Sequence, residues 1–432
     1  MVPPLPFTGH GPARYRGRVS DQASVGVSHG DALFARGSHF TPYLATGLIA
    51  RTATEAASPA VLLTAIALLG KASTGSYLVA ALTVAAALTG PVAGALIDRS
   101  HNPRASFVVG MGLLAGGLLG LVLTIGHAPV PLLMTFSFVA GLGFPAVTGA
   151  WSAQMPTMVS PANLHRGYSI DAGTYSIAAI IGPPAAAAML YISDRAPIWL
   201  PIVLLVIAIA LLRFVPLKSA VHHHEGERPT LVEDLKHGIE TILHRASLRR
   251  STFITTLGFA GQAALFISAP LLSQHLTNSL TFTGVILGFN AAGGVTAALV
   301  ITRVPIRRPD LLVIMTMFIS MLSLLLIAVA PVLWVVLLGA FIMGATDAPM
   351  LSAMYLVRNR ESSPRVRAQV FSTAASLRTA AFGLAAALFG TLLVHGTTFV
   401  LLVGVAMHLL ALVVGLAIGP PLAWHRLRKV EA

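Results

Sequence analysis

The chain has 432 residues, of which 55% are hydrophobic and only 10% charged, and its mean hydropathy is +0.80. This composition excludes a soluble globular or a disordered chain and predicts an integral membrane protein. In a soluble protein the net charge of +13 would suggest nucleic-acid binding, but here the cations fall between apolar segments, and the absence of cysteine excludes disulfides and thiol chemistry.

Residues 1–38 are rich in Gly, Pro, Arg, His and Ser and lack the apolar run of a signal peptide, so we expect a flexible cytoplasmic tail. Twelve apolar segments follow, each close to the ~20 residues that an α-helix needs to cross a bilayer. We place them at 40–68, 77–97, 105–126, 130–153, 168–192, 197–216, 251–274, 282–302, 310–330, 332–356, 368–394 and 397–419. The predicted fold class is an all-α integral membrane protein with twelve transmembrane helices.

The basic residues decide the predicted orientation. Nearly all Lys and Arg, including Arg250 and Arg358, fall in the tails and in alternate loops, whereas the opposite loops hold only Lys71 and Arg195. Because positive residues stay on the cytoplasmic side, both termini are predicted to be cytoplasmic. The abundance of Arg and Ala is typical of a GC-rich bacterial genome, so the expected location is the inner membrane of a bacterium.

The longest polar break separates two halves of six spans each. The predicted parts are the tail at 1–38, a six-helix bundle at 39–216, a linker at 217–250, a second six-helix bundle at 251–419 and a tail at 420–432. Within the linker, apolar residues recur on one helical face behind a capping-box signature; they are Leu231, Leu235, Ile239 and Ile242. We therefore expect an amphipathic helix along the inner membrane surface.

The two halves repeat each other. A shift of 204 residues places Gly294 over Gly90. The same shift superposes two pairs of loop arginines, Arg303 on Arg99 and Arg308 on Arg104. Parallel repeats of six spans are a transporter architecture, with the substrate site between the repeats near the bilayer midplane.

The stretch GPVAGALIDRSHNPR joins the second span to a charged turn. Gly90 and Gly94 stand one helical turn apart, a spacing that lets another helix pack closely. The stretch resembles the loop between the second and third helices of the major facilitator superfamily, Gly-x-x-x-Asp-Arg-x-Gly-Arg-Arg/Lys. Gly94, Asp98 and Arg99 match this pattern; the next residues depart from it, and Arg104 supplies a later cation. The resemblance implies a secondary transporter that works by alternating access.

The fifth span resembles the antiporter motif of drug:proton exchangers in that superfamily, although small residues replace most of its glycines. Gly182 and Pro183 match the motif, and helix packing alone would also select such small residues. Asp171, near the cytoplasmic start of this span, is expected to pair with loop arginines such as Arg99 in the outward-facing state. The arginine of the family's fourth-helix motif is replaced here by Ser137.

Arg51 and Glu55 lie one turn apart within the first span. A charge at the bilayer centre costs at least about 2.5–3.5 kcal/mol, so such residues face a partner or a water-filled cavity. Three interpretations stand at this point: an ion pair that orients the helix, a proton carrier at Glu55, and direct substrate binding. In the second, which we favour, desolvation favours the protonated carboxyl and Arg51 favours the carboxylate. Arg51 is also the nearest substitute for the missing fourth-helix arginine.

Arg378, near the middle of the eleventh span, is the second membrane cation without an evident partner. Asp347 in the tenth span is its expected counter-charge, either in coupling, in a bridge that closes the inner gate, or at the substrate. Gln262 and Asn290 are uncharged candidates for the cavity wall, with interhelical hydrogen bonding an equal alternative. Apolar contacts to a ligand are expected from Phe259, Phe266 and Phe382.

We therefore expect export of hydrophobic or amphipathic small molecules by proton antiport. Proton-coupled uptake of a small metabolite is the alternative, and a non-transporting receptor is a weaker one. The sequence has no HExxH pair, cysteine nucleophile or P-loop, so neither an enzyme nor a use of ATP is expected. The expected partners are a small-molecule substrate, protons and the lipid bilayer, without nucleic acid, metal or cofactor, and the chain is expected to act as a monomer.

Overall fold

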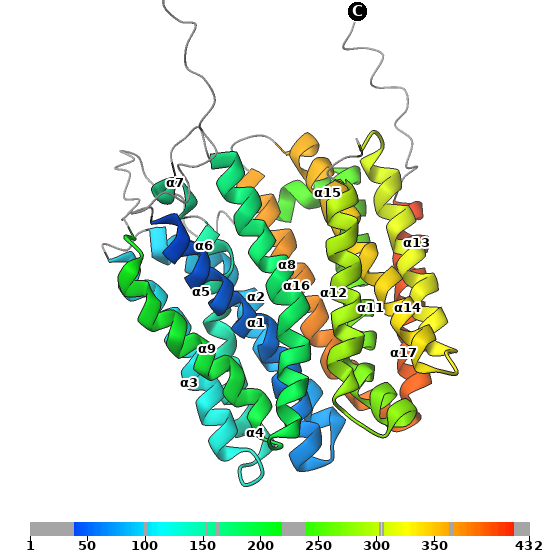
Figure 1. Cartoon of the computed structure of the whole chain (residues 1–432). Helices are drawn as coiled ribbons and strands as arrows, with labels where there is room; N and C mark the ends of the chain where they lie inside the picture. Colours follow the sequence, from blue (N-terminus) through cyan, green and yellow to red (C-terminus); the bar gives the residue numbers. More distant parts are fainter. Residues whose placement is uncertain are drawn as a thin grey trace, which may run out of the picture. The chain divides into compact units, whose positions relative to one another are not determined.

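The computed structural model describes residues 39–98, 102–152, 154–159, 164–217, 239–301, 304, 306–362 and 367–418. All regular elements in these residues are helical (Figure 1). Twelve helical segments are long and apolar enough to cross a membrane. The predicted fold class and number of spans are therefore confirmed.

The first six spans alternate direction along the chain. They are built from α1 (Phe40–Leu69), α2 (Ala72–Asp98), α3 (Pro103–Thr124), α4 (Val130–Leu142), α5 (Phe144–Val147), α6 (Gly149–Ser152), α8 (Leu164–Ala188) with the 3-10 turn η2 (Met189–Tyr191), and α9 (Ala196–Leu211) with η3 (Leu212–Phe214). The short helix α7 (Met155–Met158) lies between the fourth and fifth spans.

The second six spans follow the linker. They are α11 (Ala246–Thr277), α12 (Phe282–Ile301), α13 (Pro309–Ala328), α14 (Leu333–Ala345) with α15 (Asp347–Glu361), α16 (Arg367–Leu392) with η4 (Leu393–His395), and α17 (Thr397–Ala417). Because an even number of spans separates Phe40 from Ala417, both lie on one side of the membrane, which we call the terminal side, and the opposite side is the far side.

Two spans predicted as continuous helices are interrupted. The fourth breaks after Leu142, where Gly143 and Pro145 follow, and the tenth breaks at Thr346, three residues before Pro349. Proline lacks the backbone N–H that an α-helix needs and its ring crowds the preceding turn, which accounts for breaks at these places. The apolar segments predicted from the sequence run through both breaks, so hydropathy alone did not reveal them.

Several helices extend beyond the predicted apolar segments, since hydropathy marks only the part within hydrocarbon. The second span begins at Ala72 rather than at 77, and α15 continues to Glu361. In the linker, residues 239–244 are helical, and Ile242 packs against Leu248 and Val357 of the second half. The earlier part of the predicted amphipathic helix, with Leu231 and Leu235, lies outside the described residues.

Glycines bring helices into close contact at equivalent places in the two halves. A Cβ added at Gly141 would collide with the carbonyl of Leu82 in α2, and one added at Gly344 would collide with the carbonyl of Asn290 in α12. Backbone atoms on the neighbouring helix leave no room at either place. These approaches explain why small residues occur at related positions of the repeat.

Replacing Gly344 by alanine is expected to lower the free energy of unfolding by about 1–3 kcal/mol, because the added methyl has to displace the Asn290 backbone. Thermal unfolding of the purified protein in detergent micelles measures the effect. Gly116→Ala is the control, since a Cβ there meets no atom within 4 Å. An equal response of the two variants would contradict the close approach at Gly344.

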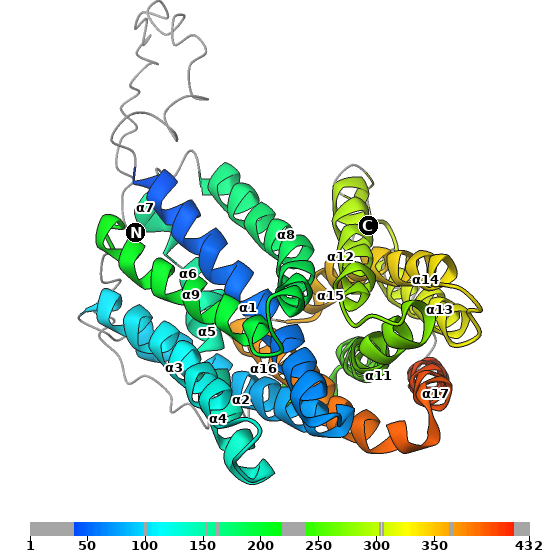
Figure 2. The ribbon, with the colours of Figure 1, turned by 60° about the horizontal axis from the view of Figure 1, so that its bottom comes forward.

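The two halves meet along two helix pairs, α2 with α16 and α8 with α12 (Figure 2). The first seam extends from Ser76 against Gly390, near the far side, to Gly90 against Ser376, toward the terminal side. This seam joins the halves over most of the length of both helices.

The second seam has close contacts near the far side. Gly284 of α12 lies against Pro184 and Ala187 of α8, and the Tyr191 hydroxyl is 3.2 Å from the Thr281 hydroxyl. Both contacts lie beyond the middle of α8, toward its far-side end. The halves are thus held together at the far side of this seam.

Candidate functional site

A buried ion pair joins α1 and α8 within the first half. Arg51 donates from Nη1 to Asp171 Oδ1 at 2.8 Å and from Nη2 to Asp171 Oδ2 at 3.0 Å. The Arg51 side chain is 0% exposed and that of Asp171 4%. This two-pronged geometry is the strongest form of an arginine–carboxylate interaction, and both partners are removed from water.

Side chains of α6 and α8 add further contacts to this pair, and Arg51 Nε is the guanidinium nitrogen left without a hydrogen-bond partner among the described residues. Arg51 Nη2 donates to Ser152 Oγ at 2.9 Å, and Ser152 Oγ donates to Asp171 Oδ2 at 2.7 Å. Thr174 Oγ1 also accepts from Arg51, and the guanidinium carbon lies 3.7 Å from the ring centroid of Tyr175. The network fixes the first, fourth and fifth spans relative to one another.

Aromatic rings close the network on the terminal side. The Tyr43 hydroxyl is 3.2 Å from Asp171 Oδ1, and its ring stacks on Trp151 at a centroid distance of 5.0 Å. Phe107 of α3 meets the edge of Trp151 at 5.2 Å. Gly47 leaves the space on α1 that the Trp151 indole occupies. Sequence reasoning missed these aromatic residues, because helix packing, and not the local sequence, decides which rings of different spans meet.

This network bears on two pairings considered from the sequence. The ion pair between Arg51 and Glu55 is not formed, because the guanidinium reaches across to Asp171 on α8 instead. The pairing of Asp171 with Arg99, expected in the outward-facing state, stays a prediction: Asp171 is bound by Arg51 here, and Arg99 lies outside the described residues. Packing of α1 on α8 brings together two charges that are remote in sequence.

Glu55 lies about halfway along the 30 residues of α1 and is partly exposed. In the part of the chain that the structure describes, its carboxylate forms neither an ion pair nor a hydrogen bond. A Cβ added at Gly182 would come within 2.9 Å of the Glu55 Cβ, so the glycine of the antiporter-like motif lets α8 approach α1 at this carboxyl. Pro183 follows it, and its carbonyl lies against Gly284 of the other half.

A second polar group lies in the other half, on α11, α15 and α16. Asp347, at the break of the tenth span, accepts a hydrogen bond from Gln262 Nε2 at 2.7 Å. Arg378 interacts electrostatically with Asp347, but no ion pair joins them among the described residues. The predicted direct pairing is therefore not made in this conformation, in which the carboxylate accepts the Gln262 hydrogen bond instead.

Phe259, Phe266 and Phe382 form one aromatic cluster beside these polar groups. The ring of Phe382 lies 5.3 Å from that of Phe259 and 5.7 Å from that of Phe266. The guanidinium of Arg378 is 4.7 Å from the Phe259 centroid. Because Arg378 and Phe382 are one turn apart on α16, a cation and an apolar surface stand side by side.

The other predicted residues have packing contacts or lie outside the described part. Asn290 donates from Nδ2 to the Ala340 carbonyl at 3.1 Å, which is an interhelical hydrogen bond. Arg104 donates to the Val215 carbonyl at 3.0 Å, and Arg308 precedes the first turn of α13. The backbone of Gly94 and Asp98 belongs to α2, the side chain of Asp98 is not described, and Arg303 lies outside the described residues.

Two arginines predicted in loops belong to helices. Arg250 is within α11 and pairs with Asp310. Arg358 is within α15 and only 1% exposed, and its Nε and Nη2 have no hydrogen-bond partner. The sequence placed them in loops because the helices continue past the apolar segments. The length of a helix beyond the hydrocarbon is not encoded in hydropathy.

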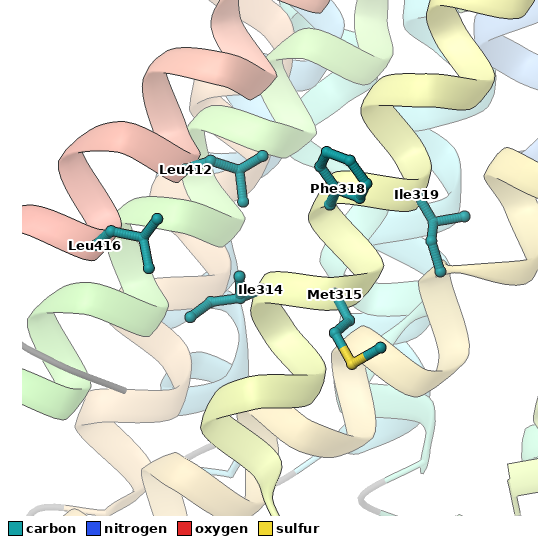
Figure 3. Close-up of a pocket in the computed structure, with 6 residues that line it drawn as sticks. All are labelled: Ile314, Met315, Phe318, Ile319, Leu412 and Leu416. Carbon is teal, nitrogen blue, oxygen red and sulfur yellow. The ribbon is translucent and has the colours of Figure 1, made fainter. Parts of the chain in front are cut away.

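An apolar pocket between α13 and α17 lies apart from both polar groups (Figure 3). It is lined by Ile314, Met315, Phe318, Ile319, Leu412 and Leu416. Several of these side chains are about half exposed, as expected for a surface that faces lipid tails. We therefore do not assign the substrate to it. No group of three potential metal ligands occurs in the described part of the chain.

Comparison with known proteins gives one family. The model of the Major Facilitator Superfamily matches residues 43–329. A protein of Sinorhizobium fredii, the uncharacterized MFS-type transporter y4rN, is 23% identical over 354 residues, which cover 80% of this chain and 86% of the relative.

Solved structures share the fold at low identity. The nucleoside transporter NupG has a TM-score of 0.74 at 11% identity, with 88% of this chain and 100% of that chain covered. A POT family transporter in complex with 5-aminolevulinic acid has a TM-score of 0.68 at 12% identity, covering 89% and 96%. A bacterial homolog of the human lysosomal transporter Spinster, inward-facing and unoccupied, has a TM-score of 0.65 at 11% identity, covering 88% and 96%. At such identities the likeness concerns the fold alone.

Proposed function

Because the chain belongs to the Major Facilitator Superfamily and is a multi-pass membrane transporter, we propose that it exports hydrophobic or amphipathic small molecules in exchange for protons. It does so by alternating access, as a monomer in the inner membrane of a bacterium with both termini in the cytoplasm. The strong excess of basic residues in the tails and alternate loops supports this orientation.

The carboxyl of Glu55 carries the proposal. It lies near the middle of a membrane-spanning helix, is partly exposed, and has no ion-pair partner among the described residues. An isolated carboxylate at that depth costs about 2.5–3.5 kcal/mol, so the group binds a proton where water is scarce and releases it where water enters. That behaviour is what a proton-coupled transporter requires.

Arg51 takes no direct part in this exchange. Its guanidinium is bound by Asp171 and Ser152 and is 0% exposed. Its role is to fix α1 on α8, so that Glu55 and Gly182 stay together while the halves move. The coupling role considered for Arg51 thus becomes an indirect one.

The apolar part of the substrate site is proposed at the aromatic cluster of Phe259, Phe266 and Phe382, with Gln262 and Asp347 as its polar edge. Binding sites for small molecules combine mainly apolar walls with a few polar groups that fix orientation. Opening of the far-side seam between α8 and α12 is the movement that releases the substrate outward.

Purified protein in liposomes that contain a pH-sensitive dye tests the proposal with a panel of lipophilic cations, anions and neutral drugs. Substrate is expected to drive protons in the direction opposite to its own flow. In Glu55→Gln this proton movement is expected to fall at least about tenfold while substrate binding persists, since the amide cannot carry a proton. Asp194→Asn, at an exposed carboxyl of the far-side turn before α9, is the matched control.

Each of the other possible results of this experiment would indicate a different mechanism. Substrate flux without proton movement means facilitated diffusion, and proton movement that persists in Glu55→Gln makes Asp347 the coupling group. Protons that move together with the substrate mean uptake by symport, which is the alternative function. Its specific support is the cluster of Asp347, Gln262 and Arg378, which also suits a polar metabolite.

A further inference from the structure

Two arginines of the second half have unsatisfied guanidinium groups. Arg358 of α15 is 1% exposed, and neither its Nε nor its Nη2 has a hydrogen-bond partner. Arg378 of α16 also has an unpartnered Nε, and it is partly exposed. Within the described residues neither forms an ion pair. A buried cation without a partner is costly, which indicates that a further group completes this region.

The charges around Arg378 do not balance. Arg358 and Arg378 interact electrostatically with each other, and Asp347 is the acidic residue that interacts with Arg378. The Asp347 carboxylate is also engaged by Gln262 at 2.7 Å. With two arginines against one aspartate the cluster keeps a net positive charge, whatever the protonation of Asp347. Tyr355 is the other titratable neighbour of Arg378.

Arg378 lies on a face of α16 that does not form the seam with α2. Residues Ser376, Gly383 and Gly390 form the face of α16 that meets α2, where they approach Gly90, Thr83 and Ser76. Arg378 and Phe382 lie on a different face and meet Phe259 of α11. The guanidinium therefore stands beside the aromatic cluster and not within the packed seam.

We propose that the substrate carries an anionic group that binds Arg378, so that the transported class is amphipathic organic anions, with the apolar body against Phe259, Phe266 and Phe382. This assignment rests on the transport function proposed above. A planar guanidinium suits carboxylate, sulfonate or phosphate oxygens. That of Arg378 lies 4.7 Å from the Phe259 centroid, and its Nε has no hydrogen-bond partner in the described part of the chain. Arg358 does not touch the substrate; it adds positive potential behind Arg378.

Matched probes test the proposal in liposomes: 4-phenylbutyrate as the anion, 4-phenylbutanol as its neutral isostere and 4-phenylbutylammonium as its cation. Carrier-dependent flux of each is measured as the difference from protein-free liposomes. In the wild type the anion is expected to be transported faster than its isosteres. In Arg378→Gln the ratio of anion flux to neutral flux is expected to fall at least about tenfold, and Arg378→Lys should retain most of it.

Two controls separate binding from folding and from charge balance. Arg213→Gln removes another arginine that lies over a phenylalanine, with 4.6 Å to the Phe214 centroid, and should leave the ratio unchanged. The double variant Arg378→Gln/Asp347→Asn removes both charges. If Arg378 only neutralised Asp347, this variant would recover anion flux, and the proposal would be wrong.

The outcomes distinguish this proposal from the transport function itself. Transport of the cation or the alcohol in preference to the anion overturns the anion site and leaves proton-coupled transport standing. An unchanged flux ratio in Arg378→Gln overturns it as well. If neither these probes nor the wider drug panel is moved by the wild type, the proposed transport function fails together with the anion site.

Discussion

Arg51→Met is expected to destabilise the first half by about 3–5 kcal/mol, the cost of leaving one partner of a buried ion pair without its counter-charge. Asp171 is 4% exposed on its side chain, so water cannot replace the lost guanidinium. Ser152 and Tyr43 would remain as its hydrogen-bond donors, which compensates only part of the charge. Unfolding by SDS titration in mixed micelles, followed by circular dichroism, measures the change.

Two further variants make the cause identifiable. Arg51→Met/Asp171→Leu removes both charges and is expected to recover much of the lost stability, because apolar side chains of similar volume replace buried ion pairs at little cost. Arg360→Met removes a cation that is 47% exposed and pairs with Asp310 at 3.0 Å, and it is expected to change the free energy of unfolding by less than about 1 kcal/mol. Equal losses in Arg51→Met and Arg360→Met would refute the central role of the buried network.

A disulfide between Ala187→Cys and Gly284→Cys is expected to stop transport, because it holds α8 against α12 at the far side. A Cβ placed at Gly284 lies 2.8 Å from the Cβ of Ala187. Moving the two atoms about 1 Å further apart brings them to the Cβ–Cβ distance of a disulfide. An intact disulfide keeps the two Cα atoms within about 7 Å of each other, so α8 and α12 cannot separate at this place until the bond is reduced. Substrate flux in liposomes before and after addition of reductant measures the effect, and the natural chain contributes no cysteine.

The control disulfide joins two helices of the same half. A Cβ at Gly404 of α17 lies 2.6 Å from the Cβ of Ala264 of α11, so Ala264→Cys/Gly404→Cys crosslinks at a comparable distance. Because both helices move together if the halves are rigid units, flux should be insensitive to this bond. Inhibition by both bonds would mean that transport requires rearrangement within the second half, and inhibition by neither would contradict opening at α8 and α12.

The number and order of the spans could be predicted because hydrophobic length is a local property of the chain. The aromatic cluster was also accessible, since Phe259 and Phe266 recur at helical spacing on one predicted span and Phe382 lies on another. What the sequence could not supply was the partner of each membrane charge. Arg51 has Glu55 one turn away, yet it binds Asp171, which is 120 residues distant and is reached only through helix packing.

The burial of Arg358 could not be predicted from the sequence either. A cation near the end of an apolar segment is ordinarily assigned to a loop, and only the continuation of α15 to Glu361 buries it. The breaks at Gly143 and Thr346 are intermediate cases: the prolines nearby are visible in the sequence, but a proline bends, breaks or is accommodated by a helix according to its neighbours.

The buried arginines Arg51, Arg358 and Arg378 differ between the two halves in whether an acidic side chain is paired with them. In the first, Arg51 is paired with Asp171, whereas in the second neither Arg358 nor Arg378 forms an ion pair among the described residues. The two regions therefore differ in how well they tolerate the substitutions that adaptation to a new substrate requires. Substitutions on α11, α15 and α16 alter recognition without breaking a finished network, while the same number of changes around Arg51 would cost the stability on which any such adaptation depends.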